Sequence, residues 1–118
     1  MKFTNLTPLL RTHNLDQSIA FHCPRLGFAC TNQTPDWAFV ERDQITLMLA
    51  LPNAHEPLDR PAFTGSLYFR TDEVDRLWQQ LKGNAEIVYP LEDFDYGMRE
   101  FAVRDNNGYS LQFGQPVA

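Results

Sequence analysis

The sequence has only two cysteines, no long apolar run and no surplus of positive charge. Because Cys23 and Cys30 cannot form a disulfide framework, we expect two small buried thiols in a cytoplasmic protein. No stretch is long and apolar enough to span a membrane, and the first residues lack the apolar core and cleavage site of a signal peptide. A net charge of −5 at pH 7 disfavours nucleic acids and anionic membranes as partners.

The length and the composition indicate a folded protein. A chain of 118 residues can bury a substantial core, so we expect a single domain over residues 1–118. Hydrophobic residues make up 43% of the chain and aromatic residues 13%, which argues against disorder.

The order of predicted elements repeats once along the chain. In the first half, strands at residues 6–12, 28–31, 37–41 and 45–51 accompany a helix that Asn14 caps and that ends near Cys23. In the second half, strands at residues 66–70 and 86–89, an acidic loop at residues 90–97 and a final hairpin accompany a helix that Thr71 or Asp72 caps. Each half therefore reads strand, helix, three strands, over residues 5–52 and 64–115, with residues 53–63 as the linker.

The final hairpin, residues 98–113, has two clearly different faces. Asn107-Gly108 supplies its turn, since both residues tolerate a positive φ. Its apolar face, which should pack on the core, carries Phe101, Val103, Leu111 and Phe113. Its opposite face, which should meet a pocket or a partner, carries Glu100, Ala102, Ser110 and Gln112.

Several stretches, in order along the chain, carry a resemblance to known proteins. They are NLDQSIAF at residues 14–21 with LGF at residues 26–28, WAFVERD at residues 37–43, and YGMREFAVRD at residues 96–105 with GY at residues 108–109. They resemble the vicinal oxygen chelate superfamily of glyoxalase I, extradiol dioxygenases and bleomycin resistance proteins, and the last stretch resembles bleomycin resistance proteins in particular. The resemblance implies an α+β fold. In it, tandem βαβββ modules form a curled mixed sheet, a trough, with helices on its convex side.

Side chains alternate across a strand, so those of opposite parity to the core residues should face the trough. These are Trp37, Phe39, Glu41, Thr46, Met48 and Ala50 in the first half, and Ser66, Tyr68, Arg70, Glu100, Ala102, Ser110 and Gln112 in the second. Trp37 and Phe39 need burial or a stacking partner because of their large apolar area. The alternation leaves open whether these two rings line a ligand site or belong to the core.

The resemblance also implies where a metal ion would bind. Metal-dependent members of the superfamily use His, Gln and Glu, and the matching positions here are Thr7, Met48, Ser66 and Gln112. Only Gln112 could coordinate a metal, whereas a Zn, Ni or Fe site needs imidazole and carboxylate ligands. The three histidines, His13, His22 and His55, lie elsewhere and are expected at the surface or at an interface. We therefore expect no metal, no cofactor and no catalytic residues.

The resemblance favours a non-catalytic protein that sequesters a small cationic or aromatic ligand, such as a bleomycin-type antibiotic. Flat cationic ligands stack on aromatic rings and pair with carboxylates. The expected ligand-binding residues are Trp37, Phe39, Glu41, Met48, Tyr68, Arg70, Tyr96, Glu100 and Gln112. In the family two chains form a dimer with clefts between them, so the resemblance implies a homodimer that binds its ligand in a dimer-interface cleft to which both chains contribute. The resemblance to bleomycin resistance proteins also implies a role in antibiotic resistance.

Two alternatives stay open. One is a metal-dependent lyase, isomerase or dioxygenase with displaced ligands, which the missing His and Glu ligands disfavour. The other is a module that binds an ordinary metabolite or a protein partner, since Arg70 in the trough could equally prefer an anion.

Overall fold

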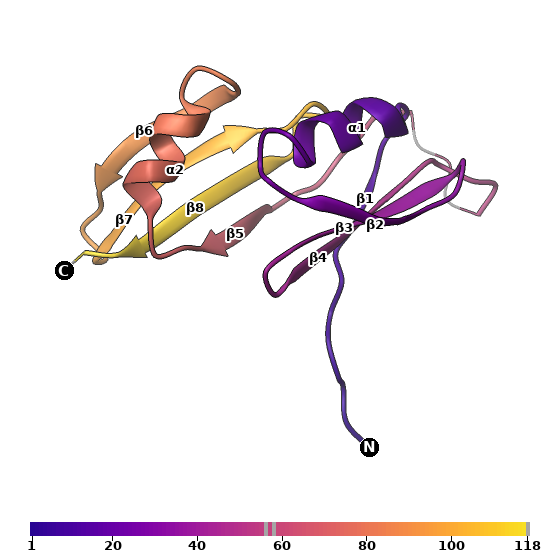
Figure 1. The fold of residues 1–118 in the computed structure, drawn as a ribbon, viewed down its shortest axis with the longest axis horizontal. Helices are drawn as coiled ribbons and strands as arrows, with labels where there is room; N and C mark the ends of the chain where they lie inside the picture. Colours follow the sequence, from indigo (N-terminus) through magenta and orange to yellow (C-terminus); the bar gives the residue numbers. More distant parts are fainter. Residues whose placement is uncertain (56, 58, 118) are drawn as a thin grey trace. The chain divides into compact units, whose positions relative to one another are not determined.

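The computed structural model describes residues 1–55, 57 and 59–117 of the chain. The chain divides into two compact units, Met1–Pro61 and Ala62–Ala118 (Figure 1). Each unit has one helix and one four-stranded mixed sheet, in the order strand, helix, three strands. The predicted α+β fold of two βαβββ modules is therefore confirmed. Within the described residues, no helix is long and apolar enough to cross a bilayer.

The first unit is built from strands β1 to β4 and helix α1. Their bounds are β1 (Leu9–Arg11), α1 (Leu15–His22), β2 (Ala29–Gln33), β3 (Trp37–Arg42) and β4 (Ile45–Ala50). The strands lie in the order β1-β4-β3-β2, with β1 parallel to β4 and the other pairs antiparallel. Helix α1 contacts β3 and β4. The core side chains of these two strands are Ala38, Val40, Leu47 and Leu49.

Helix α1 starts at the predicted cap but contradicts the prediction for one histidine. Asn14 Oδ1 accepts a hydrogen bond of 3.0 Å from the backbone N–H of Gln17. His22, which we expected at the surface or at an interface, is completely buried. Its Nδ1 donates to the carbonyl oxygen of Ser18, 2.9 Å away, because that oxygen can only accept. This hydrogen bond to a backbone carbonyl one helical turn earlier reduces the cost of burying the imidazole. The spacing of the histidines in the sequence does not indicate that His22 is buried.

The cysteines are more exposed than predicted. Cys23 is half-exposed just after α1, and Cys30 is exposed on β2. All five residues of β2, an edge strand of the first sheet, are exposed. The expectation of two buried thiols is wrong because Cys30 lies on an edge strand that presents both of its faces to solvent, and because Cys23 lies at the end of α1, where the helix leaves it half-exposed.

The second unit repeats the arrangement with strands β5 to β8 and helix α2. Their bounds are β5 (Ser66–Arg70), α2 (Val74–Leu81), β6 (Glu86–Asp93), β7 (Met98–Arg104) and β8 (Ser110–Pro116). The strands lie in the order β5-β8-β7-β6, with β5 parallel to β8 and the other pairs antiparallel. Helix α2 lies against one face of this sheet and contacts β7 and β8 (Figure 1).

The core of the second unit is an aromatic cluster under α2. Phe101 of β7 packs on Trp78 of α2 and on Phe113 of β8, with ring centroids 5.1 Å and 5.3 Å apart. The apolar face predicted for the final hairpin is confirmed, since all four of its side chains are buried. Its opposite face, which carries Glu100, therefore points away from α2.

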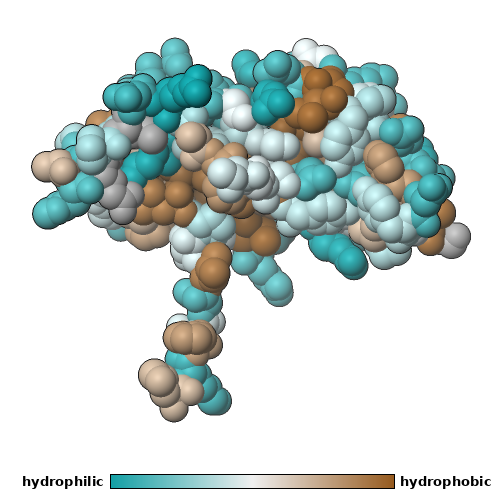
Figure 2. All heavy atoms as spheres, turned by 180° about the vertical axis from the view of Figure 1, so that it is seen from behind, coloured by the Kyte–Doolittle hydropathy of each residue, from teal (hydrophilic) through white to brown (hydrophobic). Residues whose placement is uncertain are grey.

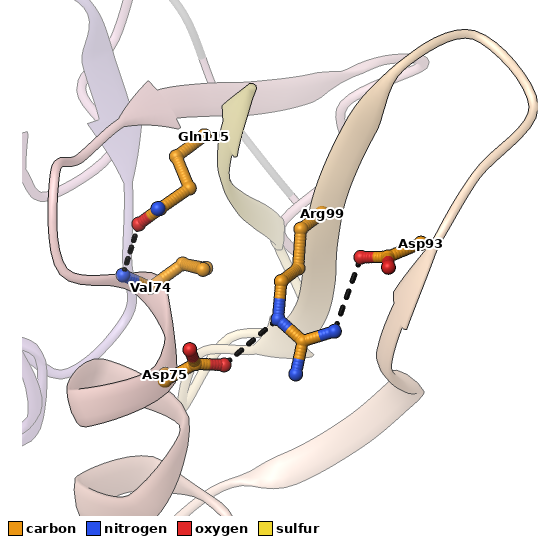
Figure 3. A network of polar contacts seen from close by, with 5 residues as sticks. All are labelled: Val74, Asp75, Asp93, Arg99 and Gln115. Carbon is orange, nitrogen blue, oxygen red and sulfur yellow. Dashed lines mark hydrogen bonds and ion pairs between the residues drawn. The ribbon is translucent and has the colours of Figure 1, made fainter. Parts of the chain in front are cut away.

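Helix α2 begins later than predicted. Neither Thr71 nor Asp72 caps it: the N-cap is Glu73, whose side chain makes no capping hydrogen bond. Instead, the backbone N–H of Val74 donates to Oε1 of Gln115 in β8 at 2.7 Å (Figure 3). The local capping signal was misleading because the acceptor comes from a strand far along the chain.

An arginine ties the start of α2 to the sheet. Arg99 of β7 lies between two carboxylates, with Nε 2.8 Å from Asp75 of α2 and Nη1 3.0 Å from Asp93 of β6 (Figure 3). These two ion pairs join a helix and two strands of the second unit. All three side chains are substantially exposed, so water and salt screen these pairs and we expect their contribution to stability to be small.

Strand β6 is longer than predicted, and part of the predicted acidic loop belongs to it. The strand runs to Asp93, although Pro90 cannot donate to a ladder hydrogen bond. Pro90 is tolerated because β6 is an edge strand whose pairing with β7 shifts in register between Tyr89 and Glu92. After the shift, Glu92 and Asp93 pair with β7 again, and the strand ends before the short turn that holds Tyr96.

The turn of the final hairpin is longer than the two residues predicted. Gly108 adopts a φ of +87°, but Asn107 does not have a positive φ. Asp105 holds the turn instead, since its Oδ1 accepts from the backbone N–H groups of Asn107 at 2.8 Å and of Tyr109 at 2.9 Å. A side chain that bonds its own turn thus replaces the expected tight Asn-Gly geometry.

Candidate functional site

Each sheet has one face against its helix and one opposite face, which we call the open face. On the open face of the first sheet, Trp37 and Phe39 are half-buried and meet edge to face, with ring centroids 5.3 Å apart. Met48 is the cross-strand partner of Phe39 and is also half-buried. Glu41 lies farther along β3, is exposed and pairs with Thr46. The first open face is therefore an apolar surface with a carboxylate near its end.

The open face of the second sheet carries a row of side chains that crosses four strands. Gln112 of β8 is the register partner of Tyr68 in β5 and of Ala102 in β7. Ala102 in turn is the partner of Tyr89 in β6. Two tyrosines thus stand at the outer strands, on either side of an amide and a methyl group.

The next row places a glycine beside a buried carboxylate. Gly114 of β8 is the partner of Arg70 on one side and of Glu100 on the other. A Cβ atom at position 114 would lie 3.0 Å from Cζ of Tyr68, nearer still to its Oη, and 3.1 Å from Cβ of Glu100. The ring of Tyr68 therefore occupies the space that a side chain at 114 would need. Arg70, by contrast, is exposed at the edge strand.

Two phenols hold the carboxylate of Glu100. The Tyr89 hydroxyl donates to Oε2 at 2.7 Å, and the Tyr96 hydroxyl donates to Oε1. Glu100 is completely buried, and none of the ion pairs within the described residues involves it. Among the described residues, Glu100 therefore has neutral hydrogen-bond donors but no positively charged partner, and a cationic ligand would provide one.

A chain of hydrogen bonds links Glu100 to the far edge of the sheet. The Nε2 of Gln112 donates to Oη of Tyr89 at 2.8 Å. The hydroxyl of Ser66, an exposed residue at the start of β5, donates to Oε1 of the same amide. We call the five residues Ser66, Gln112, Tyr89, Glu100 and Tyr96 the hydrogen-bond chain.

The environment keeps the tyrosines of this face protonated. Burial, and then the contact with Glu100, raise the pKa of Tyr89 to about 12, although the hydrogen bond from Gln112 opposes this shift. The hydrogen bond to Glu100 is the main cause that raises the pKa of Tyr96. Burial is the main cause that raises the pKa of Tyr68, followed by the charge of Glu100. At neutral pH these phenols are therefore uncharged, and Tyr89 and Tyr96 donate to Glu100 as neutral groups.

Tyr96 is presented by a tight turn between β6 and β7. Its ring stacks on Phe94, with centroids 5.4 Å apart, and Phe94 meets Tyr89 edge-on at 5.5 Å. The turn closes through the N–H of Gly97, which donates to the carbonyl of Phe94 at 3.0 Å, and Gly97 has a φ of +89°. The side chain of Tyr96 is 65% exposed, so this aromatic group is open to solvent.

The structure divides the nine expected ligand residues between the two units. Trp37, Phe39, Glu41 and Met48 lie on the first open face, whereas Tyr68, Arg70, Glu100 and Gln112 lie on the second, with Tyr96 in its β6–β7 turn. Sequence reasoning missed Tyr89, Phe94 and Gly114 as parts of this arrangement, and did not count Ser66 among the ligand residues. Alternation along β6 would not have indicated Tyr89, because a register shift places Ile87 opposite Val103 but Tyr89 opposite Ala102. No sequence signal marks the contact between Gly114 and Tyr68.

The positions that would hold a metal in the superfamily make other contacts. Ser66 and Gln112 hydrogen-bond each other, and the half-buried Met48 lies beside Phe39. Among the residues that the structure describes, no three His, Cys, Asp or Glu side chains cluster as a metal site. The absence of a metal remains a prediction.

Comparisons with known proteins agree with this architecture. A family model of the Glyoxalase/Bleomycin resistance protein/Dioxygenase superfamily matches residues 5–113. No curated protein matches the sequence. Among solved structures, the bleomycin resistance determinant encoded on the transposon Tn5 has a TM-score of 0.77 and 24% identity, covering 97% of this chain and 98% of its own.

Two further solved structures show the same likeness. TioX from Micromonospora sp. ML1 has a TM-score of 0.79 and 20% identity, with 98% of this chain and 100% of that chain covered. The lactoylglutathione lyase from Agrobacterium tumefaciens has a TM-score of 0.71 and 20% identity, with 94% and 92% covered. At sequence identities of 20–24%, these similarities show a shared fold and no more than that.

Proposed function

This chain belongs to the glyoxalase/bleomycin resistance protein/dioxygenase superfamily, and within it we propose a non-catalytic protein that binds a small cationic, aromatic molecule. The observation that carries the proposal is Glu100, a completely buried carboxylate that neutral phenols hold on an open face. A cation bound beside Glu100 would gain from a charge that bulk water does not screen. The rings of Phe94 and Tyr96 add surfaces on which a cation or a flat ring can stack.

The aromatic rings of the first open face favour a ligand that contains a flat ring. Trp37 and Phe39 are half-buried on it, so part of their apolar area remains uncovered. Such rings provide rigid platforms for a flat molecule. We propose that these two rings are stacking surfaces for a flat aromatic molecule.

The absence of catalysis is proposed because the residues that would perform it are engaged or missing. Glu100 is completely buried behind the phenols that hydrogen-bond its two oxygens, so a substrate on the surface would not come within hydrogen-bond reach of it as a base. Thr7 and Met48 are poor metal ligands. The similar Tn5 protein is a bleomycin resistance determinant, which supports a drug-like ligand and a role in antibiotic resistance, whereas the similar lyase represents the enzymatic alternative.

We also propose a homodimer, on account of the segment that precedes β1. Its apolar residues Met1, Phe3 and Leu6 have relative exposures of 118%, 98% and 85%. Figure 2 shows this segment as a protruding arm on which apolar and polar residues mix. Apolar side chains held so far from their own unit are suited to packing on a second copy. Sedimentation of the full chain should give a mass of about twice 13.6 kDa. Removal of residues 1–6 should weaken the dimer and shift the measured mass toward that of a monomer.

A cytoplasmic location is proposed as well. Cys23 and the exposed Cys30 are free thiols, which fit a reducing compartment.

A titration with metal-free bleomycin and with small aromatic amines tests the ligand class. We expect a saturable rise in melting temperature by mass action, together with a change in tryptophan fluorescence. The variant Glu100→Gln keeps the shape of the side chain but removes its charge, and it should bind the same cations at least tenfold more weakly. A shift with aromatic anions but none with aromatic cations would contradict the proposal and favour a site organised by Arg70.

A further inference from the structure

The hydrogen-bond chain on the second open face has only one possible direction when Glu100 is ionised. A carboxylate can only accept, so Tyr89 and Tyr96 must donate their single protons to it. Tyr89 Oη can then only accept from Gln112, which turns the amide N–H toward the phenol. The amide oxygen is left for Ser66, whose hydroxyl must donate. Each step is forced by the one before it.

This direction determines what the two exposed ends of the chain can offer to a ligand. The protons of Ser66 and Tyr96 both point inward, so each oxygen presents only lone pairs outward. Tyr96 is 65% exposed, and Ser66 is exposed as well. At both ends the face can accept hydrogen bonds but cannot donate them with these hydroxyls.

We infer that the Tyr96 end of the chain is a subsite for a cation that still carries N–H groups, such as a primary ammonium or an amidinium. The inference rests on the function proposed above and narrows it. The buried charge of Glu100 lies directly behind the Tyr96 oxygen, so an N–H⁺ donor there gains both a hydrogen bond and an electrostatic attraction. A quaternary ammonium would keep the attraction of the charge and of the aromatic rings but could not donate.

The neighbouring charges do not oppose this assignment. Arg70 shares the open face but lies on β5, whereas Tyr96 lies in the turn that follows β6, and these strands form opposite edges of the sheet. Arg99 is engaged by Asp75 and Asp93. An anion at the Tyr96 end would meet only oxygen lone pairs backed by a carboxylate, so anions should be rejected there.

A methylation series of one aromatic amine tests the inference on the full chain. The probes are naphthylmethylammonium and its N-methyl, N,N-dimethyl and N,N,N-trimethyl derivatives, with affinities from isothermal titration calorimetry. Each methyl group adds similar bulk, but only the last removes the final N–H. We expect a small change at each of the first two steps and a loss of about tenfold at the last step, the size of one charge-assisted hydrogen bond.

Two variants locate the effect. Tyr96→Phe keeps the ring that stacks on Phe94 but removes the oxygen, so the drop at the last methylation step should disappear. Ser110→Ala removes a hydroxyl from the neighbouring strand, where Ser110 pairs with Ser66 outside the hydrogen-bond chain, and it should leave the drop unchanged.

The outcomes separate this inference from the proposed function. If all four cations bind equally well, the N–H subsite is refuted while cation binding stands. The subsite is also refuted if the drop persists in Tyr96→Phe. If no cation in the series binds and bleomycin does not bind either, the proposed function and the subsite are refuted together.

Discussion

Replacement of Gly114 by alanine should displace Tyr68 and loosen the second open face. Gly114 does not have a positive φ, so alanine is compatible with its backbone. The added Cβ would nevertheless lie 3.0 Å from Cζ of Tyr68 and 3.1 Å from Cβ of Glu100. Tyr68 is 42% exposed and can swing into solvent, but Glu100 is completely buried and can only shift slightly.

Two opposing effects set the size of the change in stability. Overpacking by one methyl group costs roughly 1–3 kcal/mol where the neighbours cannot move freely. Alanine also restricts the unfolded chain, which offsets roughly 0.4–1 kcal/mol of that cost. We therefore expect Gly114→Ala to lower the free energy of unfolding by about 1 kcal/mol. Because burial and the charge of Glu100 raise the pKa of Tyr68, the displaced phenol should also titrate closer to its usual range.

Denaturant midpoints and an absorbance titration of the tyrosines measure both effects. The control is Gly83→Ala, because no described atom lies within 4 Å of a Cβ at that position. The double variant Gly114→Ala with Tyr68→Ala tests the coupling, since the penalty of the alanine should largely vanish once the ring is gone. If Gly114→Ala is as stable as Gly83→Ala and leaves the tyrosine titration unchanged, the ring does not rest on Gly114 and the reasoning is refuted.

Three further predictions follow from the structure. Trp78→Ala should lower the free energy of unfolding by about 3 kcal/mol, because its ring packs on Phe101 in the core. Trp37→Ala should lower it by only about 1 kcal/mol but should weaken ligand binding. Equal losses of stability in the two variants would contradict the placement of Trp37 on the open face. Folding raises the pKa of Tyr89 from 10.0 to about 12, so the stabilisation from its protonated form is complete below pH 10 and is lost as the pH rises from 10 to about 12. Melting temperatures should therefore drop over this pH range, and the drop should be smaller in Tyr89→Phe. Arg99→Met should lower the denaturant midpoint more at low salt than at high salt, and a loss that is independent of salt would mean that the two ion pairs contribute nothing.

The repeat in the sequence predicts the fold but misaligns the faces of the two hairpins. The stretch FVERD at residues 39–43 resembles FAVRD at residues 101–105, which suggests that Phe39 and Phe101 are equivalent. In the structure Phe101 lies against Trp78 of α2, whereas Phe39 lies on the open face and Val40 is the buried residue. A shift of one residue in the alignment moves every side chain of a strand to the other face of the sheet, so similar stretches of sequence can place their matching residues on opposite faces.

Alternation within each strand is a safer guide than similarity between strands. It correctly placed Phe101 and Glu100 on opposite faces, since Phe101 packs on Trp78 of α2 whereas Glu100 accepts hydrogen bonds from the phenols of the open face. It could not indicate the start of α2 at Val74, which Gln115 holds from another strand, or the burial of His22. The first feature depends on a hydrogen bond between residues 41 positions apart, and the second on the packing of α1 against its sheet; alternation within a strand encodes neither.

The two open faces differ in the residue types on corresponding strands, although the strand order is the same. Both units use the same strand order, with the first strand parallel to the last and the third in the middle of the sheet. On β3 the open face carries Trp37 and Phe39, whereas on β7 it carries Glu100 and Ala102. A large ring in place of Ala102 would stand between Gln112 and Tyr89, its two register partners, and interrupt the hydrogen-bond chain. Ala102 is therefore as necessary to the polar face as the tyrosines, since its small size lets Gln112 reach Tyr89 and keeps the buried charge of Glu100 connected to the surface.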